Sequence, residues 1–394
     1  MFSQKKSHTY TSFIRNYILC IAFYDFIFAY AIYTVYFSIQ GLSPFQISLL
    51  LTFWALSSAV FEIPSGAFAD YWSRRKMMII APILKSLCFI SWYFANGNFY
   101  IFVLGFLFWT IGSTFLSGTA EALLYDNLTA FNQKENYAKI LGKSEFYRHI
   151  AQMISIFSGG FIAYFNIKFA IIFSIFPLLF ASIFAYLLHD APKIESTGEI
   201  KYLDYFKIAF QEIKNSKILI VLFISYVIFG IFGNFDEFDQ LYYKLVNLPI
   251  WAFGIMGTIW SGISAIGVYF AHKFEKNNYI YYTVPILSGI LLFFAGYFPG
   301  IIMISAIMMA YLLNSPIKIL LESKIQHTIS SHSRATITSI SSFLLNIFGA
   351  LSFPIFGLIA TNYRVSTIYW INGIVLILFS FWVYKLITAL KKSN

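Results

Sequence analysis

The stretch Phe61-Glu-Ile-Pro-Ser-Gly-Ala-Phe-Ala-Asp-Tyr-Trp-Ser-Arg-Arg-Lys76 ends one long apolar segment and precedes another. Only residues 71–76 separate Asp70 from the next apolar run, and the last three of them are cations. Short loops rich in Lys and Arg stay on the inner side of a membrane. Gly66 would let two helices approach closely, and Asp70 is placed to cap a helix N-terminus or to pair with an arginine. The stretch predicts a tight cytoplasmic turn between two membrane helices.

The composition also indicates a membrane protein. Hydrophobic residues make up 59% of the 394 residues and charged residues only 11%, whereas soluble domains contain about 25% charged residues. The mean hydropathy is +0.71, and apolar runs of about 20 residues recur along the chain, as helices that cross a bilayer require. The net charge of +10 is not clustered on any soluble domain, so we expect no nucleic-acid partner. The two cysteines predict neither a disulfide framework nor a metal site.

Twelve spans fit the apolar runs. We expect them at residues 15–39, 44–69, 77–96, 99–125, 141–164, 167–189, 217–241, 250–272, 279–297, 299–321, 335–360 and 366–387, with both termini cytoplasmic. With this topology nearly all Lys and Arg residues of the loops fall on the cytoplasmic side, as the positive-inside rule demands. The polar segment 190–216, with a predicted amphipathic surface helix near 203–213, would then separate an N-terminal bundle (1–189) from a C-terminal bundle (217–394).

An internal repeat supports this division. At an offset of 197 residues, identical residues recur in one register over two helices, pairing Ala138, Ile140, Ser144, Phe146, Ile150 and Gly160 with Ala335, Ile337, Ser341, Phe343, Ile347 and Gly357. Two related halves are what many secondary transporters use to open alternately to each side of the membrane.

The twelve spans, the repeat, the central linker and the basic loop together resemble the major facilitator superfamily of transporters. The residues of the loop that carry this resemblance are Gly66, Asp70, Arg74, Arg75 and Lys76, with Ser73 where the family usually has glycine. The resemblance implies an all-α membrane protein with two pseudo-symmetric six-helix bundles around a central cavity. It also implies a bacterial protein of the cytoplasmic (inner) membrane. We expect a monomer that needs only the lipid bilayer, its solute and protons as partners, without a cofactor.

Charged residues inside a span cost about 2.5–3.5 kcal/mol each, so each needs a partner or a water-filled cavity. Asp25 lies in the middle of the first span, with Tyr33 and Tyr36 on roughly the same face. Asp25 is therefore a candidate proton carrier or cation anchor with the tyrosines along the route. Alternatively, it forms a fixed hydrogen bond to a neighbouring helix.

Helix 4 carries a predicted continuous polar stripe of Thr110, Thr114, Ser117 and Glu121, and helix 10 a similar one from Tyr311 to Glu322. At the offset of 197, Glu121 corresponds to Lys318. These two opposite charges are candidates for a gate across the two halves. Alternatively, each pairs within its own half, Glu121 with Arg148 and Lys318 with Glu322.

Further charged pairs are predicted inside the N-terminal half. Glu62 and Lys85 are at similar depth on helices 2 and 3, which favours a structural ion pair between them. For Arg148 the candidate partners are Asp126, Glu145 and Asp70, and the resemblance implies that such a cluster steadies the outward-facing state.

Helix 7 ends in three acids, of which Asp236 and Glu237 are the best candidates to face the mouth of a cavity. They predict either a cationic or proton-linked substrate or an external gate. Tyr311, Asn314 and Asn346 add neutral polar groups to helices expected to line the cavity.

These features predict a secondary active, proton-coupled transporter of a small organic solute that works by alternating access. Export is narrowly favoured, with proton-linked uptake of an organic solute or a siderophore-like chelate as the alternative. No nucleotide-binding glycine loop and no catalytic constellation occurs in the sequence, so we expect no enzyme. A receptor or scaffold in transporter form remains a second class.

Overall fold

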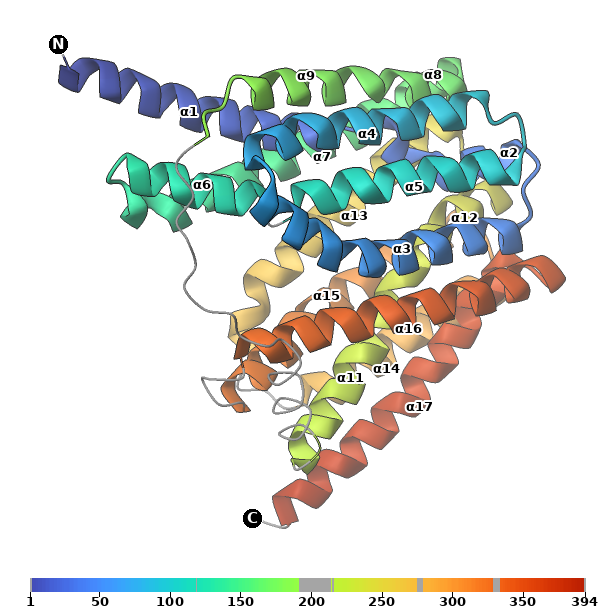
Figure 1. The fold of residues 1–394 in the computed structure, drawn as a ribbon. Coiled ribbons are helices and arrows are strands. Elements are labelled where there is room, and N and C mark those ends of the chain that lie inside the picture. Colours follow the sequence, from blue (N-terminus) through green and yellow to red (C-terminus); the bar gives the residue numbers. More distant parts are fainter. Residues whose placement is uncertain are drawn as a thin grey trace. The chain divides into compact units, whose positions relative to one another are not determined.

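The computed structural model is built entirely from helices over the part of the chain that it describes (Figure 1). That part comprises residues 2–117, 119–190, 214, 216–274, 279–328 and 334–392. The predicted surface helix near 203–213 lies outside it.

The N-terminal half contains nine α-helices and two 3-10 helices among the described residues. In chain order they are α1 (Phe2–Tyr24), η1 (Phe28–Ala31), α2 (Tyr33–Ile39), α3 (Pro44–Tyr71), α4 (Arg74–Phe94), α5 (Phe99–Leu116), α6 (Thr119–Ala130), η2 (Lys134–Asn136), α7 (Tyr137–Phe165), α8 (Ile167–Phe173) and α9 (Ile175–Tyr186).

The C-terminal half follows the same plan. Its described elements are α11 (Lys217–Asn234), η3 (Phe235–Phe238), α12 (Asp239–Leu245), α13 (Ile250–Phe270), η4 (Ala271–Phe274), α14 (Ile280–Tyr297), α15 (Met303–Thr328), α16 (Arg334–Asn362) and α17 (Val365–Lys392).

The chain divides into two compact units that nearly follow the two halves. Unit 1 comprises Met1–Leu42, Phe53–Thr197 and Ile250–Thr258, and unit 2 comprises Ser43–Thr52, Gly198–Pro249 and Ile259–Asn394. The beginning of α13 thus belongs to unit 1 and the beginning of α3 to unit 2. The division expected at residues 190–216 did not include this exchange of short segments.

Polar residues in the turns determine where several helices begin. The side chains of Ser73, Asn98 and Asn166 accept hydrogen bonds from the backbone N–H groups of Lys76, Tyr100 and Lys168. Each bond satisfies one of the N–H groups that have no partner in the first turn of a helix. The polar turns between apolar runs therefore separate the spans as the sequence predicts.

In the described part of the chain, four spans that the sequence predicts as continuous are interrupted, and one of these is the sixth, which breaks at Ser174 between α8 and α9. The first breaks at residues 25–27, between α1 and η1, and the fourth breaks near Ser117, between α5 and α6. The seventh changes to the 3-10 helix η3 after Asn234. Two of these breaks carry acidic residues, Asp25 in the first span and Asp236 with its neighbours in the seventh.

The internal repeat extends to helices where the sequence identities did not reveal it. Tyr36 donates a hydrogen bond to the backbone O of Trp92 (2.9 Å), and Tyr242 donates one to the backbone O of Ala295 (2.8 Å). Each bond joins the first helix of a half to its third helix, at offsets of 206 and 203 residues. At the same two offsets, Gly41 and Asn247 both have positive φ, and Pro82 and Pro285 both lie inside helices. The halves therefore share backbone features and not only their helix order.

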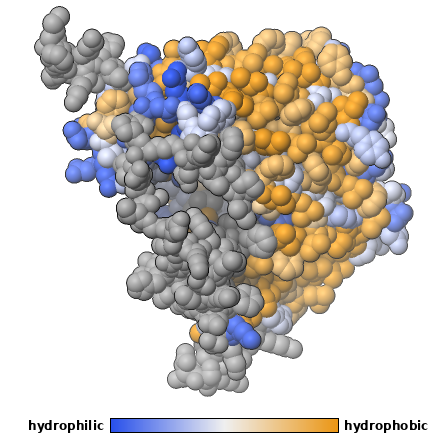
Figure 2. Space-filling model, in the orientation of Figure 1, coloured by the Kyte–Doolittle hydropathy of each residue, from blue (hydrophilic) through white to orange (hydrophobic). Residues whose placement is uncertain are grey.

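Eleven segments of the described chain are long and apolar enough to cross a membrane. The fifth predicted span, α7, does not meet this criterion, and its first half carries Lys139, Lys143, Glu145 and Arg148. Figure 2 shows a broad hydrophobic surface, and exposed hydrophobic side chains of the described chain include Phe94, Phe165 and Ile302. Such a surface is expected to contact lipid tails rather than water.

Close helix packing in unit 2 yields a test. A Cβ atom added at Gly296 of α14 would overlap the backbone of Ser366 and Trp370 on α17, whereas one at Gly262 of α13 would meet open space. We expect Gly296→Val to lower the free energy of unfolding by about 1–3 kcal/mol, the cost of overpacking. We expect Gly262→Val to cause no loss. Denaturant titration in mixed micelles measures both, and equal stability of the two variants would contradict the packing described.

Candidate functional site

The first polar cluster in unit 1 is built around Asp25, at the break that follows α1. The side chain of Asp25 is 12% exposed and contacts two cations, with its Oδ1 atom 3.3 Å from Lys85 Nζ and its Oδ2 atom 2.8 Å from Arg148 Nη1. Tyr30 donates a further hydrogen bond to Oδ1 (3.0 Å). The carboxylate therefore joins α4 and α7 to the first span by ionic bonds.

Lys85 is the residue of this cluster that the sequence interpretation misplaced. The predicted pair with Glu62 is wrong, because Lys85 is 2% exposed and bonded to Asp25, while Glu62 is exposed on α3. The Lys85 ammonium also lies 4.2 Å from the centre of the Tyr24 ring and 4.8 Å from that of Trp109. Aromatic faces attract cations in this way and replace part of the lost hydration.

Arg148 bridges two acids in unit 1. Besides its bond to Asp25, its Nε atom donates to Glu145 Oε2 at 2.8 Å, which confirms one of the three predicted partners. Asp126 is instead bonded to Arg74, and the side chain of Asp70 lies outside the described part. The alternative pair of Glu121 with Arg148 is not among the described contacts.

The basic loop of the opening stretch bonds to the ends of other helices in unit 1. Arg74 pairs with Asp126 of α6, and Arg75 donates to the backbone O of Tyr186 at the end of α9. Ser73 caps α4 and donates a hydrogen bond to Asp190 Oδ2 at 2.6 Å. The residue that departs from the family pattern is therefore used to begin α4 and to hold the chain that follows α9. Lys76 is exposed, and nothing is described of the Gly66 surroundings.

The remaining predicted residues of unit 1 do not form one route. Tyr33 and Tyr36 are buried, Tyr33 stacking on Trp92. Thr114 donates to the backbone of its own helix. The predicted continuous stripe on helix 4 is wrong, because α5 ends before Ser117 and Glu121 lies exposed on a separate helix.

A second polar cluster lies in unit 2, around Asp239 at the start of α12. Asp239 is 6% exposed. Tyr311 of α15 donates to both of its carboxylate oxygens at 2.9 Å, and Tyr369 of α17 donates to Oδ1 at 2.6 Å. Tyr369 is fully buried. Over the described residues, no cation lies within ion-pair distance of Asp239.

Three acids and one lysine determine the charge of this second cluster. Asp236 and Glu237 are half-buried on η3, within electrostatic range of Asp239. Lys318 is exposed and acts electrostatically on Asp236. The cluster therefore contains more acids than cations, unlike the balanced one around Asp25.

Two predicted polar residues of unit 2 lie outside this cluster's bonds. Asn346 is exposed on α16. Asn314 is half-buried, and no donor among the described residues reaches its Oδ1 atom. The proposed gate between Glu121 and Lys318 joins different units and stays a prediction.

The sequence interpretation ranked Asp236 and Glu237 above Asp239 and did not include Tyr369. The sequence spacing could have indicated Asp239, because this residue lies three positions from both Asp236 and Tyr242. No sequence signal marked Tyr369 on the last helix.

The family of the chain follows from its match to a protein-family model. Residues 17–353 match the model of the Major Facilitator Superfamily. The chain belongs to the major facilitator superfamily. It is therefore a multi-pass membrane transporter of some solute and not an enzyme.

Three solved structures with the same fold are distant from this chain in sequence. A bacterial homologue of the human lysosomal transporter Spinster, inward-facing and unoccupied, is 15% identical, with a TM-score of 0.74 over 97% of this chain and 96% of the other. The nucleoside transporter NupG is 12% identical, with a TM-score of 0.78 over 96% and 98%. A D-xylose-proton symporter is 17% identical, with a TM-score of 0.65 over 95% and 97%. A comparison with curated protein sequences found no match.

The Asp25 cluster makes a stability prediction. Removing one partner of a buried ion pair leaves an uncompensated charge and costs about 3–5 kcal/mol. We expect Asp25→Asn to lower the free energy of unfolding by about 3 kcal/mol, and the double variant Asp25→Asn/Lys85→Met to recover part of this loss. Denaturant titration in mixed micelles measures the free energy of unfolding of the wild type and of each variant. Lys139→Met, on the exposed surface of α7, serves as control. If the double variant were less stable than Asp25→Asn alone, Lys85 would not depend on Asp25.

Proposed function

We propose that the chain is a proton-coupled secondary active transporter of a small organic solute, with Asp239 as the group that takes up and releases the proton. The observation that carries the proposal is the contrast between two of its buried carboxylates, Asp25 and Asp239. Asp25 is bonded to two cations, whereas the described bonds of Asp239 come only from tyrosine hydroxyls.

Because burying a charge is costly, the two carboxylates are expected to have different functions. An ionised carboxylate away from water is tolerated when cations compensate its charge, and otherwise it becomes neutral by taking a proton. Asp25 is compensated in place, so its charge is expected to persist through a transport cycle. Asp239 has neutral donors, and the like charges of Asp236 and Glu237 nearby make its ionisation still more costly. Asp239 is thus able to alternate between a protonated and an ionised state when its access to water changes.

Tyr311 and Tyr369 give the proposed proton carrier a defined geometry. A tyrosine hydroxyl donates to an ionised carboxylate and can accept from a protonated one. The same two side chains therefore serve both states of Asp239 without moving far. Because α15 and α17 supply them, a shift of either helix would alter the hydrogen bonds to the carboxylate.

The proposal includes the direction of transport, the membrane, the orientation of the termini and the oligomeric state. We favour export narrowly, and the bacterial cytoplasmic membrane as the location, with both termini cytoplasmic and a monomer as the functional state. The distribution of Lys and Arg among the loops supports the cytoplasmic position of the termini. Proton-linked uptake is the second candidate, which the likeness to a D-xylose-proton symporter favours.

Proteoliposomes test the proposal. A panel of nucleosides, pentoses, short peptides and amphipathic cations is first screened by counterflow, which requires substrate exchange without a proton gradient. We expect at least one solute to exchange, and an imposed pH gradient to drive its net movement.

The variant Asp239→Asn separates coupling from exchange. We expect it to keep counterflow within about threefold of the wild type and to lose net movement driven by the pH gradient, because an amide cannot carry the proton. Glu135→Gln, an exposed carboxylate removed elsewhere, serves as control. Gradient-driven transport retained by Asp239→Asn would assign the proton to another group, and the absence of exchange by the wild type would count against transport of these solute classes.

A further inference from the structure

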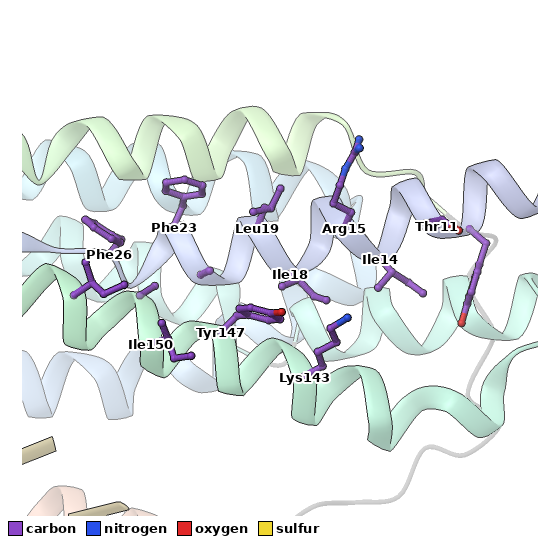
Figure 3. Close-up of a pocket in the computed structure, with 14 residues that line it drawn as sticks. Thr11, Ile14, Arg15, Ile18, Leu19, Phe23, Phe26, Lys143, Tyr147 and Ile150 are labelled. Atoms are coloured by element: carbon purple, nitrogen blue, oxygen red, sulfur yellow. The ribbon is translucent and has the colours of Figure 1, made fainter. Parts of the chain in front are cut away.

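An open groove of about 580 Å³ runs along the surface of unit 1 between α1 and α7 (Figure 3). Its walls are mostly apolar and include Ile18, Phe23 and Phe26 from the first span and Ile150 and Ile154 from α7. It is separate from the Asp25 and Asp239 clusters, because none of their bonded residues lines it.

Two cations line this groove toward one of its ends. Figure 3 shows Arg15 on α1 and Lys143 on α7 at about the same level along the two helices, with the Lys143 side chain pointing toward α1 and the Arg15 side chain pointing away from α7. Tyr147 reaches toward α1 beside Lys143. Both cations are exposed, and neither forms an ion pair with the described residues. The groove is thus cationic at the level of these two side chains, with Tyr10 and Thr11 beyond them, and apolar along the rest of its length.

The dimensions match one leaflet of a bilayer. From Lys143 to Ile154, α7 advances 11 residues, or about 16 Å at 1.5 Å per residue. Half of the hydrocarbon core of a membrane is about 15 Å thick. An acyl chain in the groove would therefore extend from the level of the cations to about the bilayer midplane.

We propose that this groove binds an anionic phospholipid, with its phosphate at the level of Arg15 and Lys143 and an acyl chain along the apolar walls. Basic residues at the membrane surface attract anionic headgroups. A zwitterionic lipid would fill the apolar part equally well but would gain less from the two cations. The site is independent of the proposed proton coupling.

Native mass spectrometry of the full-length protein in neutral detergent tests the proposal. The protein is incubated with equal amounts of phosphatidylglycerol and phosphatidylethanolamine of the same chain composition. We expect phosphatidylglycerol to be retained preferentially. The double variant Arg15→Gln/Lys143→Gln should weaken its retention by about tenfold to thirtyfold, the effect expected for two cations near the surface.

Two further variants make the result specific. Lys139→Gln removes a charge from the same helix outside the groove and should leave retention unchanged. Ala151→Trp fills the groove and should reduce retention of both lipids, which would show that a chain and not only a phosphate is bound. Thermal melting checks that each variant is folded. Equal retention of phosphatidylglycerol by the wild type and the double variant, or a dimer of the chain in place of bound lipid, would overturn the proposal.

Discussion

The cost of placing a charge in hydrocarbon governs the arrangement of the polar groups in both units. Asp25 is stable at its depth because Lys85 and Arg148 approach it from two other helices, and because Tyr24 and Trp109 surround the ammonium of Lys85 with aromatic faces. This requirement holds α4 and α7 against the first span. At Asp239, where the described residues supply no cation within ion-pair distance, the same cost favours a proton. The proposed proton carrier in unit 2 and the fixed group in unit 1 thus follow from one physical constraint.

Interrupted helices supply the geometry that these carboxylates need. A carboxylate in the middle of a regular helix projects to one side only, whereas Asp25 and Asp239 lie where the first span of each half changes its helical form. Such breaks are tolerated in membranes where protein or water satisfies the freed backbone groups. Here short hydrogen-bonded turns do so, for example Ile27 N–H to the backbone O of Asp25. An acid therefore lies at a break in the first span of each half, although Asp25 and Asp239 are not at equivalent positions of the repeat.

The sequence predicted an all-helical membrane protein with two related halves, because these features depend on composition and on identities visible along the chain. Of its twelve predicted spans, eleven are long and apolar enough in the described chain to cross a membrane, and the role of Asp25 stays a prediction. It failed where the outcome depends on which faces of two helices meet. Lys85 was paired with Glu62 because both lie at similar depth, but depth does not determine which side of α4 packs against the first span. The stripe on helix 4 failed because periodicity assumes a continuous helix. The repeat at offsets of 203 and 206 residues is carried by hydrogen bonds and backbone conformation, so it left few identities to find.

Helix α7 contributes residues both to the proposed lipid groove and to the ion cluster around Asp25. Successive residues of an α-helix are about 100° apart around its axis, so Tyr147 lines the groove while the neighbouring Arg148 bonds to Asp25. A groove can hold a lipid chain only if its two walls stay at a constant separation. The bond of 2.8 Å between Arg148 and Asp25 links these same walls, since Asp25 directly follows α1. Because the bond lies in a medium of low dielectric constant, lengthening it is costly. The ion cluster thus explains why α1 and α7 can keep an open groove at their surface without closing or separating.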